Sequence, residues 1–341
     1  MSTIAPHGLH HVTAIASDPQ RNVEFYCRVL GLRLVKQTVN FDRPDTYHLY
    51  YGDDRGRPSS LITFFPWPDV ERGREGPGLT TATALSVPPE SIGWWQQRLA
   101  GLGVDVGAPS PRDGEDALAF RDPDGMLVEL VAAPGDARSG WDGEASVPAE
   151  HAVRGLHAVT FTERELDPTA GLFTGMLGMA VAGESGNRAR FGMASGGSGA
   201  VVDVAASAAD PGLRAGGTVH HVAFRAPDLE TMTGWRDELV EAGVAVTPIL
   251  DRQYFRSIYF HEPGGVLLEI ATDAPGFDVD EPLLELGRAL RLPPWLEPDR
   301  EQITAALPPI TLPPIGPSAT RSRRSSRATA PVAGRAPCPG R

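Results

Sequence analysis

The sequence predicts an α+β protein in which four βαβββ modules pair into two cupped, half-open mixed β-barrels with helices outside. Three observations support this class. The chain repeats the order strand, helix and closing strands four times. The first and fourth repeats both open with a pair of adjacent histidines, and a Gly-, Asp- and Pro-rich segment separates the two halves. Repeated units of this size bury their apolar faces only against one another, so we expect them to pair.

The first two modules are expected to form a first domain over residues 1–133. Module one has a strand at 9–15, a helix that begins at Asp18-Pro19, and an apolar closing run at 61–65. Asp followed by Pro is a strong start signal for a helix. Module two has a strand at 79–87, a helix at 92–99 and a closing run at 122–130.

The last two modules are expected to form a second domain over residues 154–275, after a linker at 134–153. Module three repeats the opening of module one almost unchanged, as GLHAVT at 155–160. Its remaining elements are a helix at 168–177 and strands at 188–193 and 199–204. Module four has a strand at 218–223, a helix at 228–241, and closing strands at 257–260 and 263–270.

Residues beyond the modules differ in composition. We expect a helical, proline-rich extension at 276–315 and a disordered basic tail at 316–341, which is rich in Ser, Arg, Pro and Ala and contains no acidic residue. The whole chain carries a formal net charge of −12. An acidic folded core argues against nucleic acid as its partner.

The two cysteines, Cys27 and Cys338, are too few for a disulfide framework or a cysteine-based zinc site. The sequence shows neither a signal peptide nor a run of apolar residues long enough to cross a membrane. We therefore expect a cytoplasmic protein without a membrane partner. Exposed sheet edges make a homo-oligomer reasonable.

The histidine pairs predict a metal site. They lie in similar apolar frames, GLHHVT at 8–13 and TVHHVA at 218–223, and PGGVLLEI at 263–270 places Glu269 inside an apolar run. A buried carboxylate is costly without a partner. Two imidazoles and one carboxylate form the facial triad of non-haem Fe(II) oxygenases, which leaves coordination positions open.

Comparison of the modules predicts one active site and one degenerate site. The position of His11 is assigned to Thr81 in module two, Ala158 in module three and His221 in module four, and the closing carboxylate to Glu129 and Glu269. Modules one and four then supply a full triad of His11, His221 and Glu269. Modules two and three cannot hold a transition metal, so Glu129 is expected to be a structural or solvent-facing relic.

Strand geometry limits how both histidines of a pair can approach the metal. Adjacent residues on a strand face opposite sides, so only one histidine of each pair reaches the site unless the strand is bulged. This argument does not decide which histidine is the ligand. His10 and His220 could instead pack or form hydrogen bonds on the far face.

These motifs, together with the stretches at 32–41, 46–53, 63–67 and 251–259, resemble the vicinal-oxygen-chelate superfamily. Within it the chain looks most like the hydroquinone-type ring-cleaving dioxygenases, over nearly its whole length up to the tail. The resemblance implies Fe(II), or Mn(II), held by His11, His221 and Glu269, with a small aromatic substrate and O2 as partners. It also implies that the substrate pocket is lined by His10, Thr13, His220, Arg252 and Tyr259.

The pocket residues each have two interpretations. Arg252 could stabilise negative charge on the substrate or form a surface ion pair with Asp251 or a neighbouring acid. Tyr259 could donate a proton or belong to the core. His48 is expected to be a packing residue rather than a partner of the site.

Two other functions use the same architecture. A glyoxalase-type isomerase would need a further carboxylate, and the closing run of module one, around Thr63, offers none. A metal-free module that binds an aromatic compound or an antibiotic would have no need for a complete triad.

Overall fold

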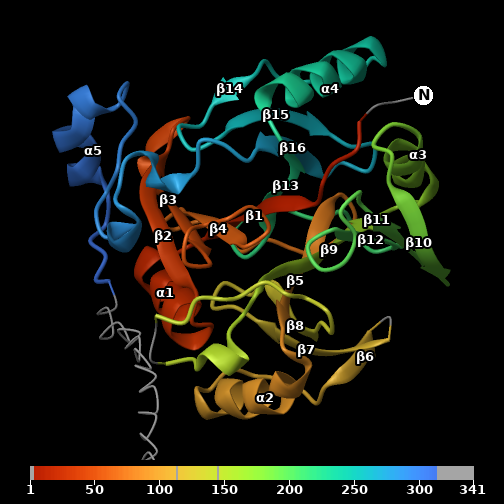
Figure 1. Cartoon of the computed structure of the whole chain (residues 1–341), viewed down its shortest axis with the longest axis horizontal. Coiled ribbons are helices and arrows are strands. Elements are labelled where there is room, and N and C mark those ends of the chain that lie inside the picture. The colour runs from red at the N-terminus through yellow and green to blue at the C-terminus, as the bar shows by residue number, and fades with distance from the viewer. Residues whose placement is uncertain (1–3, 113, 144–145, 313–341) are drawn as a thin grey trace, which may run out of the picture.

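The computed structural model describes residues 4–112, 114–143 and 146–312, which form two mixed sheets of eight strands each. The first sheet has the order β14-β15-β16-β13-β1-β4-β3-β2, and the second has the order β10-β11-β12-β9-β5-β8-β7-β6. Both curl around an inner face, with helices packed outside (Figure 1). This arrangement confirms the predicted fold class. We call the first sheet the first cup and the second sheet the second cup.

The strands of the first cup come from both ends of the chain. Module one supplies β1 (Leu9–Ala16), β2 (Arg33–Asn40), β3 (Arg43–Gly52) and β4 (Leu61–Pro66). Module four supplies β13 (Val219–Ala226), β14 (Leu250–Asp251), β15 (Arg256–His261) and β16 (Leu267–Thr272).

The strands of the second cup come from the middle of the chain. Module two supplies β5 (Leu79–Val87), β6 (Ser110–Arg112), β7 (Glu115–Arg121) and β8 (Leu127–Ala132). Module three supplies β9 (Gly155–Glu163), β10 (Ala180–Ser185), β11 (Arg188–Gly192) and β12 (Val201–Ala206).

Modules one and four therefore share one cup, as the predicted triad required, and modules two and three share the other. The two opening strands of the first cup, β1 and β13, pair antiparallel, and so do β5 and β9 of the second cup. Along one edge, each opening strand pairs with the opening strand of a module from the other half of the chain. Pairing between residues far apart in sequence therefore joins the two modules of each cup. The domain boundaries at 133 and 154 stay a prediction. Each sheet contains strands from both sides of the linker.

The helices lie on the outer faces of the sheets, as the predicted fold class requires. They are α1 (Pro19–Val23), α2 (Ile92–Gly101), α3 (Asp167–Gly175), α4 (Leu229–Glu241) and α5 (Arg300–Ala306). Asp18 and Asp228 cap α1 and α4 by accepting hydrogen bonds from backbone N–H groups. The helix of module one continues as a π-helical segment, η1 (Glu24–Val29), which buries Phe25, Tyr26 and Cys27.

Short 3-10 segments complete the described secondary structure. They are η2 (Pro89–Ser91), η3 (Ala149–His151), η4 (Phe277–Val279), η5 (Leu283–Glu285) and η6 (Glu297–Asp299). In the described part of the chain, no helix combines the length and apolar character needed to cross a membrane.

The C-terminal extension packs against β2 and β3. Lys36 on β2 is fully buried and forms ion pairs with Asp280, at 2.7 Å, and with Glu281. Gln37 donates a hydrogen bond to the carbonyl of Gly287, and Tyr47 donates one to the carbonyl of Pro308. The extension is thus part of the folded core up to Leu312, and the expected basic tail lies outside the described residues.

Candidate metal centre

Three ligand atoms converge on the inner face of the first cup. His11 Nε2 lies 3.3 Å from His221 Nε2 and 3.3 Å from Glu269 Oε2, and His221 Nε2 lies 2.9 Å from the same oxygen. All three residues are buried. They come from β1, β13 and β16, which are adjacent in the sheet although the sequence separates them by up to 258 residues.

These distances fit a metal ion. Metal–nitrogen and metal–oxygen bonds of about 2.1 Å at right angles place neighbouring ligand atoms roughly 3 Å apart. His11, His221 and Glu269 are also the one group in the described residues whose His, Cys, Asp or Glu ligand atoms gather in this way. Two imidazoles and a carboxylate on one face leave the opposite face open.

The preceding histidines contact the outer nitrogen of each ligand. His10 Nδ1 lies 2.9 Å from His11 Nδ1, and His220 Nδ1 lies 2.8 Å from His221 Nδ1. One nitrogen of each pair donates and the other accepts. A hydrogen bond at Nδ1 fixes the orientation of the ring, so that Nε2 faces the metal.

Strand bulges make this arrangement possible. In the β1–β13 pairing, His11 lies opposite Ala223 and Thr13 opposite His221, and the register shifts at His10 and at His220. A bulge inserts an extra residue into one strand, and this interrupts the alternation of side chains between the two faces of the sheet. The predicted departure from an ideal pleat is confirmed, and it brings both histidines of each pair close together.

Electrostatics favour the metal-binding forms of Glu269 and His221. Burial acts to raise the pKa of Glu269, but the imidazoles of His11 and His221 outweigh it and hold that pKa well below its usual range. Burial lowers the pKa of His221, and it lowers the pKa values of His10 and His220 to about 3. A carboxylate and neutral imidazoles are the forms that coordinate a metal.

The strand register identifies the residue on the open side of the triad. Glu269 on β16 lies opposite Ala223, two residues after His221, and Thr63 on β4 lies opposite Thr13, two residues after His11. Thr63 is therefore the module-one equivalent of Glu269. A threonine at this position supplies no carboxylate as a fourth ligand.

A chain of hydrogen bonds continues from Thr63 along the wall of module one. Thr63 Oγ1 lies 2.8 Å from Thr13 Oγ1 and 2.9 Å from His48 Nε2, and His48 Nδ1 lies 2.8 Å from Tyr50 Oη. Burial holds the pKa of His48 well below its usual range, so its imidazole is neutral. His48 was expected only to pack; it packs on Phe65 and also links two hydroxyl groups beside the triad.

A cavity of about 450 Å³ opens in front of the triad. Its wall includes the aromatic residues Phe41, Tyr50, Phe65, Trp67, Phe255 and Tyr259. A volume of this size, lined by aromatic side chains with polar groups among them, is typical of a site for a small organic ligand. His11, His221 and Glu269 form part of its wall.

The pocket contains three of the five residues expected to line it. His220, Arg252 and Tyr259 contribute to its wall. The expectation for His10 and Thr13 is wrong. His10 lies against Phe255 and His11, and Thr13 is fully buried against Thr63, so both stand behind the wall.

Arg252 and Tyr259 contact one another in the pocket. Arg252 Nε donates to Tyr259 Oη at 3.3 Å, and its guanidinium forms an ion pair with Asp42 rather than with Asp251. Burial, and next the charge of Glu269, raise the pKa of Tyr259 far above its usual range, so the phenol keeps its proton. The ring of Tyr259 also meets His221 edge to face.

Sequence reasoning missed Asp42 and Tyr50. Asp42 lies in a hairpin turn and Tyr50 in an apolar strand, where nothing in the local pattern marks them. The sequence had placed the missing carboxylate of module one around Thr63. The register confirms this position, because Thr63 lies opposite the second residue after His11, as Glu269 does for His221.

In the second cup, an arginine lies among the residues equivalent to the triad and its neighbours. Its register places Ala82 and Ala158 at the positions of His221 and His11, with Glu129 and Asp203 at the closing positions. The assignment of Thr81 to this position was wrong by one residue, because Thr81 occupies a bulge equivalent to that of His220. Arg112 forms ion pairs with both Glu129 and Asp203. Glu129 is therefore a structural residue of the second cup and is not solvent-facing.

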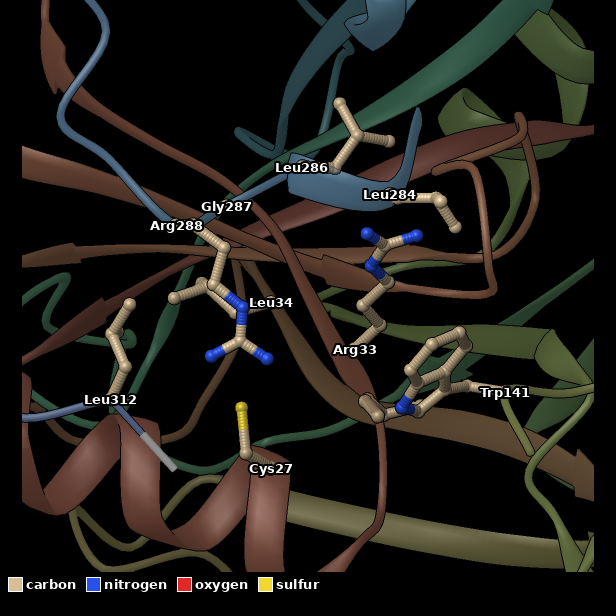
Figure 2. A pocket seen from close by; sticks show the side chains of 10 residues that line it. Cys27, Arg33, Leu34, Trp141, Leu284, Leu286, Gly287, Arg288 and Leu312 are labelled. Carbon is tan, nitrogen blue, oxygen red and sulfur yellow. The ribbon is translucent and has the colours of Figure 1, made fainter. Parts of the chain in front are cut away.

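A second pocket lies away from the triad, beneath the C-terminal extension. Figure 2 shows the Cys27 thiol and the Arg288 guanidinium pointing toward one another within it, close to Leu34. Its volume is about 40 Å³, which is room for little more than ordered water. The cavity at the triad is therefore the better candidate for a substrate.

Comparison with known proteins agrees with this geometry. A family model described as the Glyoxalase/Bleomycin resistance protein/Dioxygenase superfamily matches residues 8–130 and 155–270. A Bacillus subtilis protein named "Putative ring-cleaving dioxygenase MhqO" is 42% identical over 303 residues, which cover 89% of this chain and 96% of the relative. The "Chlorohydroquinone/hydroquinone 1,2-dioxygenase" of Sphingobium indicum is 34% identical over 307 residues, which cover 87% and 94%.

Solved structures support the same assignment. The crystal structure of a protein described as a "putative dioxygenase" from Bacillus subtilis has a TM-score of 0.87 at 39% identity and covers 91% of this chain and 99% of its own. Glyoxalase I from Zea mays has a TM-score of 0.57 at 14% identity, covers 78% and 92%, and shows the shared fold alone. On the family match and these relatives, the chain belongs to the Glyoxalase/Bleomycin resistance protein/Dioxygenase superfamily.

Proposed function

We propose that this protein is an Fe(II)-dependent dioxygenase that cleaves the ring of a hydroquinone, with Mn(II) as the alternative metal. The observation that carries the proposal is the three-residue ligand set of His11, His221 and Glu269, whose open side faces an aromatic-lined cavity. The relatives named as ring-cleaving and hydroquinone dioxygenases support the substrate class. The cytoplasmic location and the homo-oligomer expected from the sequence stay predictions.

The bound metal would supply a Lewis acid for a substrate hydroxyl and an electron donor for O2. The protein residues have separate parts. His10 and His220 hold the ligand imidazoles through Nδ1, and Ser257 donates a hydrogen bond to the second oxygen of Glu269. The aromatic wall would stack on the ring and exclude water from the open side.

Two pocket residues would act on the substrate directly. The Arg252 guanidinium is a fixed cation beside Tyr259 and would stabilise negative charge that develops on a substrate oxygen. The Tyr259 phenol, which keeps its proton, would donate a hydrogen bond to the same oxygen. The hydroxyl groups of Thr63 and Tyr50, joined through His48, would fix the wall of module one.

Oxygen consumption tests the proposal. Metal-free protein is loaded with Fe(II) without oxygen and mixed with hydroquinone, methylhydroquinone or catechol in an oxygen electrode, and a separate assay follows methylglyoxal with a thiol by absorbance. Oxygen uptake with a hydroquinone and near-stoichiometric iron supports the proposal. Thiol-dependent isomerisation with Ni(II) or Zn(II) and no oxygen uptake would assign the protein to the glyoxalase-type isomerases instead. Inactivity in both assays, with no metal bound, would indicate a binding module.

A further inference from the structure

Arg252 in the first cup and Arg112 in the second cup occupy equivalent positions. Tyr259 lies opposite Glu269 and Ala119 opposite Glu129, so β15 corresponds to β7. Along these strands, Leu250 pairs with Ser257 as Ser110 pairs with Ala117. Counting two residues forward from Leu250 and Ser110 gives Arg252 and Arg112. The two cups therefore show the same arginine in two surroundings.

Arg112 points inward. Its guanidinium contacts Glu129, donates to Asp203 Oδ2 at 2.9 Å and donates to Thr160 Oγ1 at 2.6 Å. These partners are equivalent to Glu269, Thr63 and Thr13 of the first cup. The guanidinium thus occupies the space in the second cup that corresponds to the metal position in the first.

Arg252 points instead toward the mouth of its pocket. Its Nη1 and Nη2 donate to the two carboxylate oxygens of Asp42 at 3.3 and 3.0 Å, and its Nε donates to Tyr259. Asp42 lies in the turn between β2 and β3, and its side chain is 69% exposed. The two-pronged ion pair therefore joins the hairpin of module one to the loop of module four.

Among the described residues of the second cup, none is a counterpart of Asp42. Tyr50 and Arg190 are equivalent because they lie opposite Thr63 and Asp203. The last paired residue of the module-one hairpin, Arg43, is seven residues from Tyr50, whereas its counterpart Arg188 is two residues from Arg190. The shorter hairpin ends before it reaches the arginine, and Ala119 in place of Tyr259 offers no hydroxyl group.

We propose that Asp42 is a positioning residue that holds Arg252 away from Glu269 and so keeps the metal position open. Without Asp42, Arg252 gains the inward position that Arg112 adopts, where it pairs with the buried Glu269 carboxylate. That pair competes with the metal, because both cations need the same oxygen atoms. The inference rests on the metal centre of the proposed function and adds a residue that controls access to it.

Metal binding tests the proposal without reference to turnover. The full-length metal-free protein is titrated with Mn(II) alone, and the free ion is followed by electron paramagnetic resonance. Asp42→Asn is expected to weaken Mn(II) binding by about two- to five-fold, the effect available to an exposed ion pair. The double variant Asp42→Asn/Arg252→Gln is expected to bind Mn(II) as tightly as the wild type, because the competing cation is gone.

Asp45→Asn is the matched control. Asp45 is exposed on the same hairpin and pairs with Arg43 at 3.4 Å, so its loss should leave Mn(II) binding unchanged. Asp42→Glu keeps the charge and should bind Mn(II) nearly as tightly as the wild type. Equal affinity of the wild type and Asp42→Asn overturns the inference, as does a double variant as weak as Asp42→Asn. A wild type that does not bind Mn(II) overturns both the inference and the metal centre, and one that binds Mn(II) but consumes no oxygen with Fe(II) overturns only the proposed function.

Discussion

Thr63 occupies in module one the position that Glu269 occupies in module four. Both residues lie on a closing strand, opposite the second residue after a histidine of the triad. This relationship explains how the fold presents two histidines and only one carboxylate. It also identifies the side from which a substrate would reach the metal.

Replacing Thr63 should close that side. We expect Thr63→Glu to add a fourth ligand, to lower the dissociation constant for Mn(II), and to reduce oxygen uptake by about ten-fold or more, because the position for the substrate is taken. Thr63→Gln has the same size without the charge. If Thr63→Glu binds Mn(II) no more tightly than Thr63→Gln does, the added carboxylate does not reach the metal.

The triad should be distinguishable from its degenerate counterpart. His11→Ala, His221→Ala and Glu269→Ala should each weaken metal binding beyond the roughly 10–100-fold effect of losing a residue that only supports a ligand. Glu129→Ala should retain a full metal complement, since Glu129 pairs with Arg112 in the other cup. Metal content after dialysis measures both outcomes. An equal loss of metal in Glu129→Ala would show that the assignment of the metal to the first cup is wrong.

His10 should act through the orientation of His11. His10→Leu removes the hydrogen-bond partner of His11 Nδ1 and should weaken metal binding by about 10- to 100-fold. His10→Asn places a polar atom near the lost Nδ1 and should recover part of the affinity. Isothermal titration with Mn(II) compares the two. Equal affinities for the Leu and Asn variants would mean that His10 only fills space.

Arg112 should matter for stability and not for metal binding. Arg112→Ala leaves the carboxylates of Glu129 and Asp203 without their shared cation in a largely buried site. Removing one partner of a buried ion pair costs about 3–5 kcal/mol, so we expect a clear loss in the free energy of unfolding. Urea unfolding of the protein measures it. A normal unfolding midpoint for Arg112→Ala would show that the network contributes little.

Glu163 should make the stability depend on pH. Burial, and next the neighbouring Glu262 carboxyl group, raise the pKa of Glu163 from 4.5 to about 8. Between these values the folded state binds more protons than the unfolded state, so stability falls as the pH rises from about 4.5 to about 8. Glu163→Gln removes this loss and should raise the melting temperature more at pH 8 than at pH 5. Glu165→Gln, on an exposed residue two positions away, is the control and should show no such difference.

The sequence by itself determined the modules and the ligand types. Strand and helix spacing, the Asp caps and the repeated histidine pair are local signals, and they predict the four modules and the triad of His11, His221 and Glu269. The strand patterns of β1, β5, β9 and β13 were clear because these strands are apolar and buried.

Only the tertiary structure decided the register of the strands and which side chains meet. The histidine pairs and Glu269 already predicted that modules one and four share a cup, and the order of the strands confirms this although the two modules lie at opposite ends of the chain. The bulge at Thr81, equivalent to the one at His220, makes Ala82 rather than Thr81 the counterpart of His221, and the bulge at His10 accompanies the position of that residue behind the pocket wall. The direction of a side chain also depends on residues far away in the sequence. Arg112 and Arg252 occupy equivalent positions in the two cups, but Arg112 pairs with Asp203 inside its cup and Arg252 pairs with Asp42 on a hairpin turn.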